Sequence, residues 1–260
     1  MNSHEQFQRD VASNIESLRA DVDLQALSRI WIREITSHRW AYNFSWLGRP
    51  AIQFPNDAWA MQEIIWEVRP DLIIETGIAH GGSLIFNASM LALLDLVDAA
   101  SANGTINPRI SNRKVLGVDI DIRSYNRAAI EEHPLSSRIQ MIQGSSISTE
   151  VIEEVNKIAS AYSRILICLD SNHTHDHVLE ELRAYAPLTS VGSYCVVFDT
   201  IIEDMPESFF PERQWSVGNN PKTAVHKYLE THPEFTIDQN IHHKLLITVA
   251  PDGYLKRVRK

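Results

Sequence analysis

Ile73-Ile74-Glu75-Thr76-Gly77-Ile78-Ala79-His80-Gly81-Gly82-Ser83 is the stretch that decides the fold. A short apolar run passes through an acid and a glycine-rich turn into a helical pattern that continues to residue 97. This order is typical of a buried strand that ends in a tight turn and leads into a helix. Ligands of open parallel sheets bind beyond the carboxyl ends of the strands, so we expect a ligand at this turn.

The chain around this turn alternates between apolar runs and helical patterns. The runs are short, continuous and rich in Ile, Val and Leu, which is typical of parallel strands covered on both faces. Two late runs are expected to pair in antiparallel fashion. The sequence therefore predicts an α/β fold with a doubly wound, mostly parallel, seven-stranded, Rossmann-like sheet. The expected strands are 72–75, 115–119, 139–142, 165–169, 194–198, 235–237 and 245–249, and the expected helices are 83–97, 124–132, 148–159, 174–185 and 224–230.

The N-terminal part differs from this pattern. Residues 3–36 have an amphipathic helical pattern, and a segment rich in Trp, Gly and Pro follows at 39–59. We expect residues 1–56 to form a helical extension and substrate-lid segment, and residues 57–260 to form the ligand-binding domain. Asp57 is expected to cap a helix at 58–68, and Ser83 the helix after the turn. The apolar face of the extension needs a cover, which points to a homo-oligomer.

Composition excludes several classes of protein. The formal net charge of the 260 residues is -9, which argues against a nucleic-acid partner, since such surfaces are basic. The polar N-terminus lacks the apolar core of a signal peptide, and no run approaches the roughly 18 apolar residues of a membrane span. We therefore expect a cytoplasmic protein without a membrane partner. Cys168 and Cys195 lie in apolar runs and are expected to be buried, unpaired thiols.

The turn does not match the common phosphate-binding loops. Its spacing is G-x-x-x-G-G, whereas a dinucleotide fold needs G-x-G-x-x-G and a Walker loop needs G-K-[ST]. Glu75 precedes the first glycine and suits an amino-acid ammonium better than a pyrophosphate. Asp119 ends the second strand, where an acid accepts hydrogen bonds from ribose hydroxyls. Ser145 follows the third strand and is expected to border an adenine, so the three turns together predict a nucleoside site.

Acids also end the next two strands. Asp170 follows the fourth strand and Asp199 the fifth, so both are expected at the same edge of the sheet as the glycine turn. Two carboxylates there can hold Mg²⁺, which lowers the pKa of a bound hydroxyl. His173 is the candidate to accept the proton, instead of the metal or beside it. Thr200, next to Asp199, is a further candidate ligand.

A zinc site is the sharpest rival interpretation of this region. His173-Thr174-His175-Asp176-His177 nearly matches the H-x-H-x-D-H motif of metallo-β-lactamase-type hydrolases. It is one residue short, and that motif belongs to a fold with two facing sheets. The alternation of strands and helices does not favour such a fold. The ordinary interpretation of His175 and His177 is the solvated first turn of a helix.

Three stretches together resemble the cephalosporin hydroxylase / rhamnosyl O-methyltransferase family. They are residues 39–86 with the Trp-rich segment and the glycine turn, residues 169–188 with the D-x-x-H pattern, and residues 232–257. The resemblance implies a class I S-adenosylmethionine-dependent methyltransferase that O-methylates a sugar or secondary metabolite with a divalent metal. It places the metal at Asp170, with His173 following it. The cofactor site that it implies, together with the residues deduced above, comprises Glu75, Thr76, Gly77, Ala79, Gly81, Ser83, Asp119 and Ser145.

One position departs from the family pattern. The resemblance implies that the fifth strand ends in an adjacent Glu-Asp pair, as in the family. In this chain the two residues are Phe198 and Asp199. A metal would then have one carboxylate fewer, with Thr200, a water or Glu203 as its replacement. If the metal is lost, His173 carries the base role alone. The alternative function is a methyltransferase-like binding subunit of an oxygenase system. Trp46, Arg49, Gln53 and the loop 209–221 are expected to form the acceptor pocket.

Overall fold

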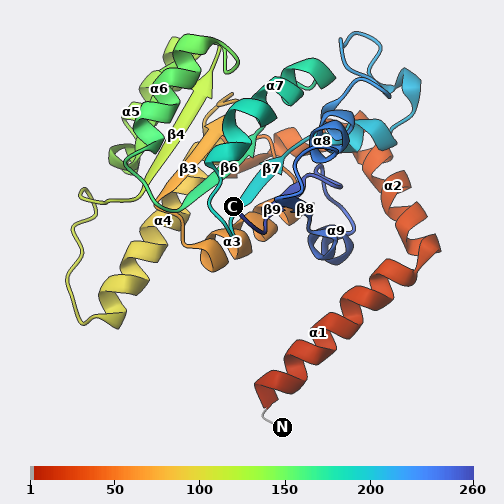
Figure 1. The fold of residues 1–260 in the computed structure, drawn as a ribbon, viewed down its shortest axis with the longest axis horizontal. Helices are drawn as coiled ribbons and strands as arrows, with labels where there is room; N and C mark the ends of the chain where they lie inside the picture. The colour runs from red at the N-terminus through yellow and green to blue at the C-terminus, as the bar shows by residue number, and fades with distance from the viewer. Residues whose placement is uncertain (1–2) are drawn as a thin grey trace.

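The computed structural model describes residues 3–260. Its centre is one seven-stranded sheet in the order β5-β4-β3-β6-β7-β9-β8, in which β9 runs antiparallel to both of its neighbours and the other pairs are parallel. The predicted mostly parallel, doubly wound sheet is therefore confirmed (Figure 1). The strands are β3 (Leu72–Thr76), β4 (Lys114–Asp119), β5 (Ile139–Gln143), β6 (Ile165–Leu169), β7 (Tyr194–Val197), β8 (Phe235–Ile237) and β9 (Tyr254–Arg257).

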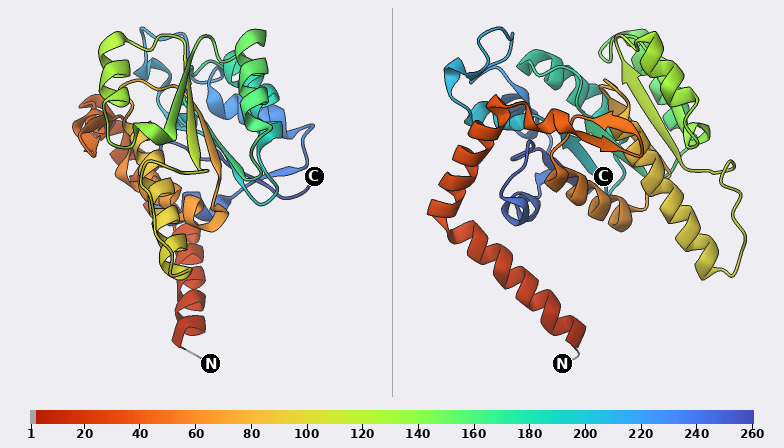
Figure 2. Two further views of the ribbon diagram at one scale, coloured as in Figure 1. Left: turned by 90° about the vertical axis from the view of Figure 1, so that its left-hand side faces the viewer. Right: turned by 180° about the vertical axis from the view of Figure 1, so that it is seen from behind.

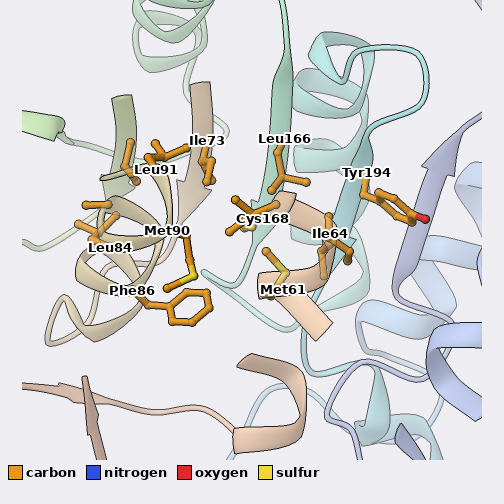
Figure 3. Close-up of a cluster of buried hydrophobic side chains, with 14 of the residues drawn as sticks. Met61, Ile64, Ile73, Leu84, Phe86, Met90, Leu91, Leu166, Cys168 and Tyr194 are labelled. Atoms are coloured by element: carbon orange, nitrogen blue, oxygen red, sulfur yellow. The ribbon is translucent and has the colours of Figure 1, made fainter. Parts of the chain in front are cut away.

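Helices cover both faces of the sheet because successive strand residues point to opposite sides. Ile73 packs on one face with apolar side chains of α3, α4 and α5, whereas Leu72 and Ile74 pack on the other with side chains of α6, α7 and α8. Figure 3 shows part of the first layer, in which Met61 and Ile64 of α3 approach strand residues. The helices are α3 (Pro55–Val68), α4 (Gly82–Ser101), α5 (Ser124–Glu131), α6 (Thr149–Ala159), α7 (His175–Tyr185), α8 (Pro221–Leu229) and α9 (Gln239–Leu245).

The helical pattern predicted for residues 3–36 is confirmed by two helices. Residues 1–2 of the expected extension lie outside the described residues. α1 (Ser3–Ala20) projects from the body as an arm, and α2 (Val22–Ser37) leads back to it (Figures 1 and 2). Phe7 on α1 and Trp31 on α2 are exposed. Contact of this arm with a second copy of the chain stays a prediction, as does the division at residue 56.

A short hairpin of β1 (Phe44–Trp46) and β2 (Arg49–Ala51) binds the extension to the glycine turn. Gly82 lies directly under this hairpin, where a Cβ would overlap the Pro50 carbonyl oxygen and Ala51. The Arg49 guanidinium donates to the His80 carbonyl, with Nε–O 3.0 Å and Nη2–O 2.6 Å. The hairpin therefore fixes the backbone of the turn from above.

Two predictions of local structure are wrong at places where tertiary contacts decide. The run 245–249 is not a strand, because α9 ends at Leu245 and the last strand is β9. The Val249 N–H donates to Asp57 Oδ2 at 3.0 Å, so it is not available to a β-ladder. Asp57 in turn is not the helix cap, since α3 already begins at Pro55 and the buried carboxylate also accepts from Thr248 and Tyr254.

Helix α4 corrects two further expectations. Its N-cap is Gly81, with φ +82°, so Ser83 lies inside the helix and is not the cap. The helix is also long and apolar enough to span a membrane by length and composition, with a mean hydropathy of 1.5, although no such run was expected. Half of this apolar stretch is buried in the protein, where Leu84 and Leu91 pack against the sheet. Cys168 and Cys195 are buried and unpaired, as predicted.

Candidate active site

The sheet reverses its strand order between β3 and β6, which is where open α/β sheets bind ligands. Gly77 follows β3 and Asp170 follows β6, so the two residues meet at this switch point. The Asp170 N–H donates to the Thr76 carbonyl at 2.9 Å. Gly77 has φ +90°, and a Cβ there would overlap the Asp170 carbonyl oxygen. Only glycine permits this approach without strain.

Glu75 ends β3 in a buried position, with 2% of its surface exposed. The Ser83 hydroxyl donates to its Oε1, and the Asn87 amide donates to its Oε2 at 2.8 Å. Burial raises the pKa of Glu75 to about 7, against the effect of these two donors. The carboxylate thus joins β3 to the first turns of α4, and Ser83 rather than Glu75 lines the cleft at the glycine turn.

Asp119 ends β4 beside the glycine turn. Its Oδ2 accepts from the backbone N–H groups of Ile78 at 2.7 Å and Ala79 at 3.2 Å. Ala79 itself has φ +47°, a conformation that a non-glycine residue adopts only under constraint. Asn126 supplies part of that constraint, because its amide donates to the Ala79 carbonyl at 2.9 Å. Asp119 therefore lies on the cleft wall, fixed by the turn that it borders, and its role toward a ribose stays a prediction.

Asp170, His173 and Asp199 converge at the ends of β6 and β7. One ligand atom from each lies within 4.8 Å of the other two. His173 Nε2 is 3.2 Å from Asp199 Oδ2, and the ring of Trp215 packs edge-on against the imidazole at 4.8 Å. Asp199 has φ +56° and begins the turn η4 (Thr200–Asp204), so its carboxylate is held at a constrained backbone position.

The electrostatics of this group favour a cation. Burial, together with the nearby carboxylates of Asp199 and Glu75, raises the pKa of Asp170 well above its usual range. Within residues 3–260, neither Asp170 nor Asp199 forms an ion pair with a lysine or arginine. Two carboxylate oxygens near an imidazole fit a hard divalent ion, whose charge would relieve the repulsion.

The remaining predicted residues lie less directly at this site. Thr76 is fully buried in the sheet. The Thr200 side chain is buried too, and its hydroxyl donates to the Pro251 carbonyl at 2.6 Å, so it points to the chain rather than to the acids. Ser145 follows β5 but is not among the residues that line the two cavities described below. Its assignment to the adenine stays a prediction.

The three histidines of the near-zinc motif diverge. His173 faces Asp199, whereas His175 Nδ1 contacts the Thr223 hydroxyl at 2.8 Å. His177 Nε2 contacts the Ser146 hydroxyl at 3.0 Å. The structure therefore does not assemble the rival zinc site from these side chains.

Two cavities meet at the candidate site. The larger, of about 740 Å³, contains the glycine turn, Asp119 and the Asp170–His173–Asp199 group. The smaller, of about 430 Å³, lies between the β1–β2 hairpin, α3 and α4. Its wall includes Met61, Phe86, Met90 and Cys168, which Figure 3 shows together beside the sheet. The walls shared by both cavities are Gln53, Phe54, Ser83, Asp170 and Phe198.

Sequence reasoning missed several residues that build the site. Asn87 and Asn126 support the acid and the turn, and a polar side chain within an apolar helix was the available signal for Asn87. Trp215 was included only as part of the loop 209–221. Of the residues expected around the acceptor, Gln53 lines both cavities and Trp46 the smaller one. Arg49 instead holds the turn.

The sheet order and the glycine turn at the switch point give this chain the Rossmann-like fold of the methyltransferase CmcI. The chain belongs to the Rhamnosyl O-methyltransferase/CmcI family, whose model matches residues 38–258. The predicted family is therefore confirmed, and with it the class of S-adenosylmethionine-dependent O-methyltransferases.

Two curated relatives and two solved structures illustrate the likeness. Rhamnosyl O-methyltransferase of Mycobacterium bovis (strain BCG / Pasteur 1173P2) is 28% identical over 228 residues, which are 85% of this chain and 83% of the relative. The Mycobacterium leprae (strain TN) protein of that name is also 28% identical, over 85% of this chain and 88% of the relative. The Mg–SAM form of CmcI has a TM-score of 0.55 and 18% identity, covering 84% of this chain and 78% of CmcI. The apo form of CmcI has a TM-score of 0.54 and 18% identity, covering 84% of this chain and 78% of CmcI.

Proposed function

We propose that this chain transfers the methyl group of S-adenosylmethionine to a sugar hydroxyl, with Mg²⁺ held by Asp170 and Asp199. The sugar follows from the rhamnosyl O-methyltransferases that it resembles over 85% of its length. Support for the metal comes from the acid group, and from the CmcI structure that contains Mg and SAM in the same fold. The cytoplasmic location and the absence of nucleic-acid or membrane partners belong to this proposal as well.

One observation carries the proposal: Asp170 belongs to both halves of the site. Its backbone lies against Gly77 of the glycine turn, and its side chain lies with Asp199 and His173. A methyl donor held along the turn therefore ends next to the atoms that would hold the acceptor oxygen. Such proximity is what a direct displacement between two bound molecules requires.

The side chains of the chain then have separable tasks. Ser83 and the turn backbone hold the amino-acid end of the donor, and Asp119 accepts hydrogen bonds from its ribose. When bound, S-adenosylmethionine supplies the methyl group, and Mg²⁺ lowers the pKa of the acceptor hydroxyl. His173 accepts the hydroxyl proton while Asp199 orients its ring through the 3.2 Å contact. The sulfur–carbon bond breaks as the oxygen–carbon bond forms, which leaves S-adenosylhomocysteine and the methyl ether.

The experiment combines binding with turnover. Calorimetry measures S-adenosylhomocysteine binding to the full chain, and transfer of a labelled methyl group to a rhamnoside is followed with Mg²⁺ and with EDTA. We expect cofactor binding in both conditions and methyl transfer only with Mg²⁺. Asp170→Asn should abolish the Mg²⁺-supported transfer, and the matched control is Asp176→Asn, an exposed acid in the first turn of α7.

The outcomes separate the parts of the proposal. Failure to bind S-adenosylhomocysteine would refute the proposed methyl transfer and favour the binding-subunit alternative. Full activity in EDTA would overturn only the metal. His173→Gln should slow transfer without weakening Mg²⁺ binding. If Mg²⁺ affinity falls instead, His173 is a metal ligand and not the base.

A further inference from the structure

Two arginines line the wall of the larger cavity without an acidic partner. Arg39 and Arg213 contribute to the cleft that contains the Asp170–His173–Asp199 group. In the part of the chain that the structure describes, neither side chain forms a hydrogen bond or ion pair with a carboxylate. By contrast, Arg113 and Arg138 both pair with Asp95. Both side chains are exposed, so their guanidinium groups are open to a ligand in the cleft.

Both guanidinium groups are held by aromatic rings. The Arg39 Cζ lies 4.4 Å from the centroid of Tyr42, and the Arg213 Cζ lies 5.0 Å from the centroid of Trp215. Stacking orders a guanidinium through its face and leaves its N–H edge open to a ligand. Tyr42 and Trp215 line the same cavity, so both cations are placed at this cleft by neighbouring rings.

An apolar cluster ties together the two segments that bear these arginines. Arg39 immediately precedes Trp40, and the backbone N–H of Arg213 donates to the Phe210 carbonyl at 3.1 Å. Trp40 and Phe210 pack against one cluster with Phe54. The cluster thus joins the end of α2 to the loop that follows η5 (Glu207–Phe209), so both arginines come from segments packed on a common core.

A chain of ring contacts places Arg213 near the Asp170–His173–Asp199 group. Trp215 contacts the His173 ring at 4.8 Å and carries Arg213 on its own ring at 5.0 Å. The Arg213 guanidinium therefore lies no farther from the His173 ring than the sum of these two distances. A pyranose with a phosphate substituent can bridge such a span, with its hydroxyl at the acids and its phosphate at the arginine.

We propose that Arg39 and Arg213 bind the phosphate of a phosphorylated acceptor, so that the substrate is a sugar phosphate or nucleoside-diphosphate sugar. This inference rests on the methyl transfer proposed above. Guanidinium groups bind phosphate oxygens with paired N–H donors, whereas a neutral sugar would leave both charges unused. The same two cations offset the repulsion between an anionic acceptor and the three acids of the cleft, Asp119, Asp170 and Asp199.

The test uses the full chain without divalent metal, saturated with S-adenosylhomocysteine so that the nucleoside site is filled. Calorimetry measures binding of UDP, glucose 1-phosphate and unphosphorylated glucose. Arg39→Met and Arg213→Met keep the length of the side chain and remove its charge, and the control is Arg29→Met on the exposed side of α2. We expect each cleft variant to weaken binding of the phosphorylated probe about tenfold, with the control unchanged.

Each outcome decides. If UDP binds and glucose 1-phosphate does not, the acceptor is a nucleoside-diphosphate sugar, and the reverse result identifies a sugar monophosphate. Added salt should weaken binding of the phosphorylated probe to the parent protein more than to a variant that carries both Arg39→Met and Arg213→Met. The inference is overturned if a protein that binds S-adenosylhomocysteine binds neither phosphate probe, or if the arginine variants bind both as the parent does. Loss of S-adenosylhomocysteine binding alone would refute the methyl transfer and not the phosphate site.

Discussion

Glu75→Gln should make the cofactor-free protein more stable at high pH and leave its stability at low pH nearly unchanged. The carboxyl group of Glu75 has an ordinary pKa of 4.5, which burial raises to about 7 in the folded protein. The folded state therefore holds a proton that the unfolded state has lost. The stability that this proton contributes is complete below pH 4.5 and is lost as the pH rises through 7.

The magnitude follows from the size of this shift. One pKa unit corresponds to about 1.4 kcal/mol, so ionising Glu75 in the fold costs on the order of 3 kcal/mol at pH 8.5. The side chain is 2% exposed, so solvent screens little of this effect. Glutamine has the same shape and no charge. Its amide can also pair with the Asn87 Oδ1, which is buried and lacks a partner in the described chain.

The assay is urea unfolding, followed by tryptophan fluorescence, at pH values from 5 to 8.5 and constant ionic strength. The difference between Glu75→Gln and the parent should grow across this range. Glu153→Gln, an exposed acid on α6, should show no such trend. A difference that does not change between pH 5 and pH 8.5 would refute the reasoning. A large loss of S-adenosylhomocysteine affinity in Glu75→Gln would show that this carboxylate also acts directly on the ammonium.

Three further predictions test the frame of the site. Gly77→Ala should destabilise the fold by about 3 kcal/mol, measured in urea, and weaken S-adenosylhomocysteine binding in calorimetry, because the new Cβ overlaps Asp170 at a positive φ. Thr200→Val should lose about 1 kcal/mol, since it removes the hydrogen bond to Pro251, while the Mg²⁺ dependence of turnover stays as in the parent. Asp57→Asn should lose about 2 kcal/mol at pH 7, because one amide oxygen replaces the two carboxylate oxygens that accept from Val249, Thr248 and Tyr254, and urea unfolding should show less fall in stability as the pH rises through 6.

The parallel part of the sheet could be predicted because each strand carries its own signal. A strand such as 165–169 is covered on both faces, so every residue is apolar and the run is continuous. The end of the chain lacks such a signal. The strand β9 includes Lys256 and Arg257, and the more apolar run 245–249 is held by the buried carboxylate of Asp57. A contact between residues so distant in sequence leaves no local pattern.

The site could be predicted to the same extent and for the same reason. Parallel strands end at one edge, so an acid after β6 and an acid after β7 must lie near each other, and the structure brings Asp170 and Asp199 together. What the pattern could not give is the partner of each side chain. Glu75 faces Ser83 and Asn87 of α4, and Thr200 faces Pro251 of a distant loop, so both contacts depend on how separate segments pack together. The homo-oligomer and the cytoplasmic location stay predictions.

Phe198 shows how the chain can retain a cation site with one acid fewer than the family pattern implies. Its ring is 6% exposed and packs with the apolar side chains between the sheet and α3, so a carboxylate there would be buried. The His173 imidazole lies beside the remaining acids, with its Nε2 3.2 Å from Asp199 Oδ2. Because Mg²⁺ prefers oxygen ligands, Asp170 and Asp199 would hold it in the proposed site and the imidazole would stay free. We therefore expect the change at Phe198 to weaken the hold on the metal while His173 stays beside it, so that turnover reaches half of its maximum only at a high Mg²⁺ concentration.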